Sequence, residues 1–131
     1  MATTDIIEKI RERVAASPPS VLAVYLYGSR ARGTASATSD LDLGLLLRAT
    51  PPPSLRSAAR DLEAAIEAAV GVPVDGVVLN TAPADLVHRV LRDGVLLLDR
   101  DRSARIRFEV QSRNEYFDLA ALRRLYRRLP A

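Results

Sequence analysis

Cysteine is absent from the chain, so neither a disulfide framework nor a thiolate metal site can form. No apolar run approaches the ~18–20 residues that a membrane-spanning helix needs. Residues 1–13 carry six charged side chains and lack the apolar stretch of a signal peptide. These absences predict a cytoplasmic protein without membrane contact.

The chain is also short, at 131 residues. That length predicts one domain over residues 1–131, able to bury about two-thirds of the surface that its unfolded form exposes. A composition of 48% hydrophobic and 27% charged residues is typical of a globular protein. The length leaves no room for a separate lid domain or nucleic-acid-binding domain.

The net charge of +3 conceals an uneven distribution. Residues 1–101 hold 11 basic and 13 acidic groups, whereas residues 102–131 hold eight arginines and three acids. The basic C-terminal segment could face nucleic acid, nucleotide phosphates or an acidic partner surface. A solvated helix face explains the same pattern equally well at this point.

Apolar periodicity and chain-breaking residues predict alternating helices and strands. The expected strands cover residues 21–27, 40–47, 72–79 and 95–98. The expected helices begin at Thr3 or Thr4 and end before residues 17–20, and then cover 54–70, 84–92 and 101–128. This order predicts an α/β (α+β) sheet covered by helices. In the last helix we expect a core of Ile106, Val110, Phe117, Leu122 and Leu125, with Tyr116 and Tyr126 as packing residues.

Residues 28–39 predict a loop, with one helical turn near residues 30–35. Gly28 ends a buried strand and allows the backbone to turn and approach a ligand closely. Ser29 adds a hydroxyl beside the loop N–H groups, an arrangement suited to phosphate. Arg30 and Arg32 can supply positive charge to phosphate oxygens.

Three aspartates suggest a cation site. Asp40 and Asp42 lie two apart in the expected strand, so both carboxylates point to one face. Asp75 lies in an otherwise apolar run and would join them if its strand were adjacent. Such carboxylates suit Mg²⁺ bound together with substrate phosphates. Alternatively, Asp-x-Asp marks a turn or an exposed strand face, and Asp75-Gly76 marks a hairpin turn.

The remaining polar aromatic residues favour structural roles. His88, the one histidine, lies between apolar positions at helical spacing, which indicates a helix surface or a half-buried site. Tyr25 and Tyr27 alternate with Leu26 and therefore share one face of a strand. We expect both tyrosines to pack on the sheet.

Gly28-Ser29, ten residues and then Asp40-Leu41-Asp42 resemble the signature of the nucleotidyltransferases of the DNA polymerase β superfamily. Gly-Ser-Arg-Ala-Arg-Gly followed by Ser-Asp-Leu-Asp-Leu is similar to the minimal nucleotidyltransferases (MNT). The resemblance implies a small mixed β-sheet flanked by helices. It also implies that Gly28 and Ser29 hold the triphosphate of ATP. The metal ligands would be Asp40, Asp42 and Asp75, with two Mg²⁺ ions.

The same resemblance implies a biological role. Proteins of this kind are often antitoxins encoded beside a HEPN ribonuclease, and they transfer AMP from ATP to a tyrosine of that toxin. We therefore expect a hetero-oligomer or a homodimer, and no direct contact with nucleic acid. The toxin is also the favoured partner of the arginines at 123, 124, 127 and 128. Two alternatives remain: an antitoxin that masks the toxin by contact alone, and a nucleotidyltransferase acting on a small molecule or RNA.

Overall fold

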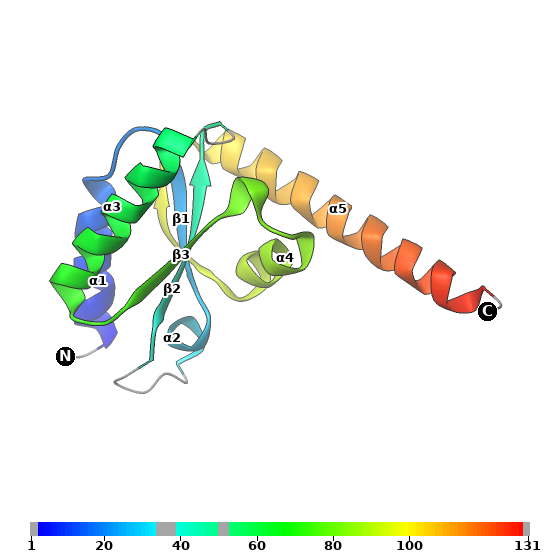
Figure 1. Cartoon of the computed structure of the whole chain (residues 1–131), viewed down its shortest axis with the longest axis horizontal. Coiled ribbons are helices and arrows are strands. Elements are labelled where there is room, and N and C mark those ends of the chain that lie inside the picture. Colours follow the sequence, from blue (N-terminus) through cyan, green and yellow to red (C-terminus); the bar gives the residue numbers. More distant parts are fainter. Residues whose placement is uncertain (1–2, 34–38, 50–52, 130–131) are drawn as a thin grey trace.

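A four-stranded sheet with helices on both faces forms the body of the protein, as Figure 1 shows for the computed structural model. The structure describes residues 3–33, 39–49 and 53–129. Its elements are α1 (Thr3–Ala15), β1 (Val21–Tyr27), α2 (Ser29–Arg32), β2 (Leu41–Leu47), α3 (Pro53–Val70), β3 (Val74–Val78), a 3₁₀ turn (Leu79–Thr81), α4 (Ala84–Asp93), β4 (Val95–Asp99) and α5 (Arg102–Arg128). The order of helices and strands predicted from sequence is confirmed.

The strands are arranged in the order β3-β2-β1-β4. β1 runs antiparallel to both β2 and β4, whereas β2 and β3 are parallel, so the sheet is mixed. Residues 21–26 and 43–47 of the two central strands are all buried. Continuous apolar runs of this kind arise because both faces of the sheet are covered.

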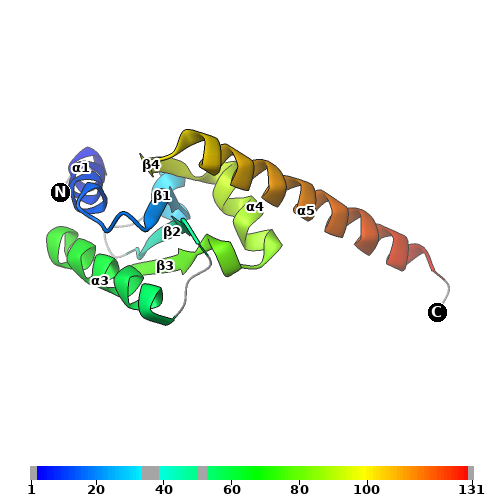
Figure 2. The same cartoon turned by 90° about the horizontal axis from the view of Figure 1, so that it is seen from above.

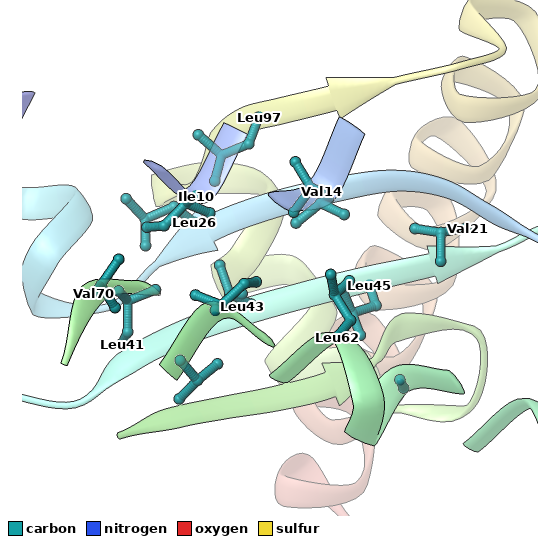
Figure 3. Packing of buried hydrophobic residues seen from close by; sticks show 14 of the residues in the cluster. Ile10, Val14, Val21, Leu26, Leu41, Leu43, Leu45, Leu62, Val70 and Leu97 are labelled. Atoms are coloured by element: carbon teal, nitrogen blue, oxygen red, sulfur yellow. The ribbon is translucent and has the colours of Figure 1, made fainter. Parts of the chain in front are cut away.

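Two hydrophobic clusters hold the helices against the sheet. Helices α1 and α3 cover one face, and α4 and the first part of α5 cover the other (Figure 2). Ile10 and Ile66 lie among the alternate leucines of β2 in the first cluster, part of which Figure 3 shows. Val87 and Val90 anchor α4 in the second. Burying each such side chain fully contributes about 1.5–3 kcal/mol.

The expected core of the last helix is wrong. Ile106, Val110, Phe117, Leu122 and Leu125 are 39–57% exposed, and Tyr126, expected to pack, is 64% exposed. Only one side of α5 meets the body, and the helix continues beyond α4 (Figure 1). Apolar residues at helical spacing therefore indicated that α5 is an amphipathic helix, but they did not indicate whether its apolar side is buried. In the described ranges, no helix combines the length and apolar content needed to cross a membrane.

Aromatic stacking joins α4 to α5. The rings of His88 and Tyr116 stack with centroids 3.7 Å apart and planes 3° from parallel. Farther along α5, Arg123 donates to Asp85 of α4 across 3.2 Å. The expected half-buried histidine and the packing role of Tyr116 are both confirmed.

A polar network fixes the beginning of α5 to the sheet. The hydroxyl of Tyr25 donates to Glu109 across 2.7 Å, and Arg105 bridges Glu109 at 2.9 Å and Asp99 at 2.7 Å. Burial, followed by the hydrogen bond to Glu109, raises the pKa of Tyr25. The side chains of Arg105, Asp99 and Glu109 are only 15–22% exposed. Tyr25 thus lies on the sheet face as expected, with a polar partner that its sequence context did not reveal.

Arg105→Ala is expected to lower the free energy of unfolding by about 2 kcal/mol, because two largely buried carboxylates lose their shared cation. Urea unfolding measures this loss. Arg107→Ala, an exposed change two residues along the same helix, is the control and should cost less than about 0.5 kcal/mol. Equal losses in the two variants would contradict a structural role for the network.

Candidate active site

Three polar side chains form a row across one end of the sheet. Tyr27, the last residue of β1, pairs with Asp42 of β2, and Asp42 pairs with Asp75 of β3. Residues paired directly across strands project from the same face, here the face that carries α4. Gly76 lies within β3 and pairs with Leu43, so the hairpin-turn interpretation of Asp75-Gly76 is wrong.

Gly28 turns the chain away from this row. Its φ of 76° and ψ of −157° belong to a region that is essentially restricted to glycine. A Cβ at Gly28 would collide with the carboxylate of Asp42. The backbone between Tyr27 and α2 therefore lies directly against that carboxylate, and the close approach to a ligand expected of Gly28 stays a prediction.

The short helix α2 follows at Ser29–Arg32 and ends at Gly33, whose φ of 74° is left-handed. The amide of Arg32 donates to the carbonyl of Gly28 across 3.2 Å. A helical turn was expected near residues 30–35, and the structure places it slightly earlier. Residues 34–38 of the expected loop lie outside the described residues.

The row carries concentrated negative charge. Burial raises the pKa of Asp42, and the charges of Asp75 and Asp40 raise it further, while Arg32 opposes them. Burial also raises the pKa of Tyr27, with added effects from Asp42 and Asp75. A cation near these oxygens would relieve the repulsion.

A cavity of about 410 Å³ opens beside the row, within the size range of small-ligand sites. One side comes from the end of β1, α2 and β2, and the other comes from α4. Its lining residues are Tyr27, Gly28, Ser29, Arg32, Asp42, Leu86, Arg89 and Asp93. Two arginines and two carboxylates thus face one space, and the arginines suit a phosphate-bearing ligand.

Arg30 lies outside that lining and holds the chain beside Asp40. Its Nε and Nη2 donate to the carbonyl of Ser39 across 3.1 and 2.8 Å. Asp40 itself is exposed and immediately precedes β2. The observed contact positions the segment that carries Asp40, and the phosphate contact expected of Arg30 stays a prediction.

The cavity also includes residues that the sequence analysis did not identify. Leu86, Arg89 and Asp93 share one side of α4 at spacings of three and four residues. That spacing is visible in the sequence, but nothing local indicates that this side of α4 faces the end of β1. Tyr27 was expected only to pack and also lines the cavity.

Two glutamates of α3 support the strand that carries Asp75. Glu67 accepts a hydrogen bond from the amide of Val74 across 2.8 Å. Glu63 accepts from the backbone of Gly76, and its pKa is raised by burial and by the charge of Asp75. β3 is an edge strand, so these carboxylates occupy backbone donors that would otherwise lack a partner strand.

Within the described part of the chain, no three acidic, histidine or cysteine side chains are close enough to form a complete metal site. Asp42 and Asp75 are adjacent across two strands, and Asp40 is near enough for its charge to affect Asp42. The oxygen donors suit Mg²⁺, and they lie beside a cavity that can admit further ligands from a substrate.

The comparisons with known structures agree with this arrangement. A chain in the crystal structure of a toxin–antitoxin with AMP-PNP is 27% identical, with a TM-score of 0.76 over 92% of this chain and 94% of that chain. A chain of a toxin–antitoxin MntA-HpeT carrying two Asp-to-Glu substitutions is 25% identical, with a TM-score of 0.72 over 96% and 95%.

A third match is to a complex of the tri-AMPylated Shewanella oneidensis HEPN toxin with an MNT antitoxin. It is 23% identical, with a TM-score of 0.73 over 95% of both chains, and at that identity it supports the fold alone. A search of curated proteins finds no match.

The family comparison covers both the predicted signature and the row of side chains. The family model described as polymerase beta, nucleotidyltransferase matches residues 8–103, which include the Gly28-Ser29 turn, Asp40, Asp42 and Asp75. The resemblance inferred from the sequence is thereby confirmed, and the chain belongs to the polymerase beta nucleotidyltransferase family.

Proposed function

We propose that this protein is an antitoxin that transfers AMP from ATP to a hydroxyl, most simply a tyrosine, of a partner HEPN toxin. The observation that carries the proposal is the row Tyr27–Asp42–Asp75, which lies beside Gly28 and the cavity. This row places acidic oxygen donors and a turn suited to phosphate at one end of the sheet. Nucleotidyl transfer requires both features.

The nucleotide site consists of the Gly28-Ser29 turn and two cations. We assign contacts with phosphate oxygens to backbone N–H groups at the turn and to the hydroxyl of Ser29. Arg32 and Arg89 lie on opposite sides of the cavity, from α2 and α4 respectively. We assign the triphosphate to the space between these two arginines, because their charge offsets that of the phosphates.

The proposed Mg²⁺ ligands are Asp40, Asp42 and Asp75. Bound Mg²⁺ would neutralise charge on the phosphate oxygens and on the attacking and leaving oxygens. Arg30, through its hydrogen bonds to Ser39, holds the segment that presents Asp40. Glu63 and Glu67 hold the strand that presents Asp75.

The reaction is an in-line displacement. The acceptor oxygen attacks the α-phosphorus of ATP, a new P–O bond forms, and the bond to the β-phosphate bridging oxygen breaks. Pyrophosphate leaves with the electron pair of that bond, and the hydroxyl proton passes to the carboxylate of Asp75. The Gly28-Ser29 turn and Arg32 hold the phosphates during the displacement.

The assignment of a toxin as the acceptor draws on structural similarity. The chain with 27% identity belongs to a toxin–antitoxin structure that contains AMP-PNP, an ATP analogue. The alignment covers nearly all of both chains, so it includes the cavity and α5. A cytoplasmic location follows from this role and stays a prediction.

Labelled ATP tests the reaction type. With Mg²⁺ and the HEPN toxin present, label on the α-phosphate should be incorporated into the toxin, whereas label on the γ-phosphate should be released in pyrophosphate. Excess EDTA should abolish incorporation, because it removes the Mg²⁺ that the proposed ligands bind together with the nucleotide. Incorporation of γ-label, or full incorporation in EDTA, would contradict the proposal.

A further inference from the structure

Helix α5 extends away from the body of the protein. Its 27 residues span roughly 40 Å, and the C-terminal part projects past α4 (Figures 1 and 2). Phe108 and Tyr116 pack against the body. Farther along α5, Arg123 forms an ion pair with Asp85 in the first turn of α4. Residues 122–129 form an arm whose large apolar side chains have no cover in the described part of the chain.

The arm carries a regular apolar stripe. Leu122, Leu125 and Tyr126 follow the spacing i, i+3, i+4, which places them on one side of the helix, and Leu129 directly follows the last helical residue. They are 45%, 57%, 64% and 56% exposed. A stripe of large side chains this exposed is typical of a surface that another protein covers.

Positive charge flanks the stripe: Arg123 and Arg128 lie about 60° from its edges, whereas Arg124 and Arg127 lie on the opposite side of the helix. The arm contains Arg123, Arg124, Arg127 and Arg128, and no acidic residue follows Asp118. Among the described residues, Arg123 pairs with Asp85, and no ion pair is present for the other three arginines. The surface that covers the stripe therefore needs carboxylates at its edge.

Helix α4 connects the arm to the candidate active site. Asp85 and His88 lie on the side of α4 that contacts α5. Leu86 and Arg89, on the adjoining side, line the cavity. A protein held by the arm and resting against α4 would therefore present its surface close to the proposed nucleotide site.

We propose that the α5 stripe and its arginines dock the acceptor protein through an apolar groove bordered by carboxylates, next to the nucleotide cavity. The identity of that acceptor as the HEPN toxin rests on the proposed function. A second copy of this chain is a poorer occupant, because it would bring two sets of unpaired arginines onto one surface. RNA is also poorer, because it would leave the leucines uncovered.

The test is the dissociation constant for a HEPN toxin, measured by calorimetry. The double variant Leu122→Asp/Leu125→Asp should weaken binding about tenfold or more, because it places charge in the docked stripe. Val110→Asp is the matched control: Val110 is 46% exposed on the same helix but lies about 18 Å along the axis from Leu122. It should change the dissociation constant by less than about twofold.

A charge-reversing variant tests the second half of the proposal. Arg128→Glu should also weaken toxin binding, and it should make the remaining binding less sensitive to salt. Circular dichroism and the affinity for AMP-PNP should match the wild-type values in all of these variants. The loss is thereby attributed to docking and not to unfolding or to the nucleotide site.

Four results would overturn the docking proposal: no toxin binding by the wild-type chain, equal binding by the Leu122/Leu125 variant, equal loss in Val110→Asp, or dimers of the wild-type chain that this variant dissociates. RNA binding that the arginine variant abolishes and the leucine variant retains would likewise assign the arm to RNA. If the wild-type chain binds the toxin through the arm but transfers no AMP, the docking proposal stands and the proposed function fails.

Discussion

Asp42→Asn is expected to reduce AMP transfer to the toxin about a thousandfold or more, without loss of the fold. Asn preserves the size of the side chain but removes the charge needed to hold a metal ion. Asp42 is paired with Asp75, lies against Gly28 and lines the cavity, so the substitution removes the carboxylate that contacts the phosphate turn. Initial rates of α-labelled ATP incorporation measure the effect.

The same variant should be at least as stable as the wild type at neutral pH. The raised pKa of Asp42 means that the folded chain holds this proton more tightly than the unfolded chain does. The protonated carboxyl contributes to stability at low pH. This contribution is lost as pH rises from the ordinary aspartate pKa through the raised pKa of the folded chain. Asn does not titrate, so the same rise in pH should not lower the free energy of unfolding of the variant through this group.

Asp61→Asn is the control, since Asp61 is exposed on α3, away from the cavity. It should retain full transfer and wild-type stability. Transfer by Asp42→Asn at a rate comparable to that of Asp61→Asn would contradict the proposed metal site. A large loss of stability in Asp42→Asn would instead show that the carboxylate supports the fold.

Gly28→Ala is expected to produce the second large effect. Alanine disfavours the backbone conformation of Gly28, and its Cβ would displace the carboxylate of Asp42. We expect a loss of about 2–3 kcal/mol in the free energy of unfolding, from strain of about 1–3 kcal/mol with added crowding. We also expect a drop in transfer of about a hundredfold or more, because the phosphate turn and a metal ligand move together.

Gly33→Ala provides the matched control at the other end of α2. Gly33 also has a positive φ, of 74°, but no neighbouring atom lies within 4 Å of an added Cβ in the described part of the chain. Its cost should be about 1 kcal/mol, with little change in transfer rate. Equal losses of transfer activity in the two glycine variants would contradict a requirement for close packing of Gly28 on Asp42.

The helices and strands could be predicted because their signals are local. Residues 21–27 and 41–47 are rich in apolar residues, and turns or prolines bound them. The sheet order β3-β2-β1-β4 has no such local signal, because the largely apolar central strands specify no neighbour. The burial of α5 could not be predicted either, since the pattern of an amphipathic helix does not say what covers it.

The site residues likewise divide into those that a local motif predicts and those that only the fold brings together. Gly28, Ser29, Asp40 and Asp42 lie within one short motif, so their joint placement follows from chain connectivity. Asp75 depended on β3 lying beside β2, which only the structure provides. Arg89 had no signal of its own, because its role depends on where α4 packs. The contact of Arg30 with Ser39 likewise depends on how the loop between them closes.

The intact mass of the HEPN toxin, after incubation with ATP, Mg²⁺ and this protein, tests the central claim most directly. We expect a gain of one or more whole AMP units on a tyrosine of the toxin, and no gain with Asp42→Asn. A toxin that is bound and neutralised by the wild-type protein, yet keeps its unmodified mass, would contradict enzymatic transfer and favour masking by contact alone.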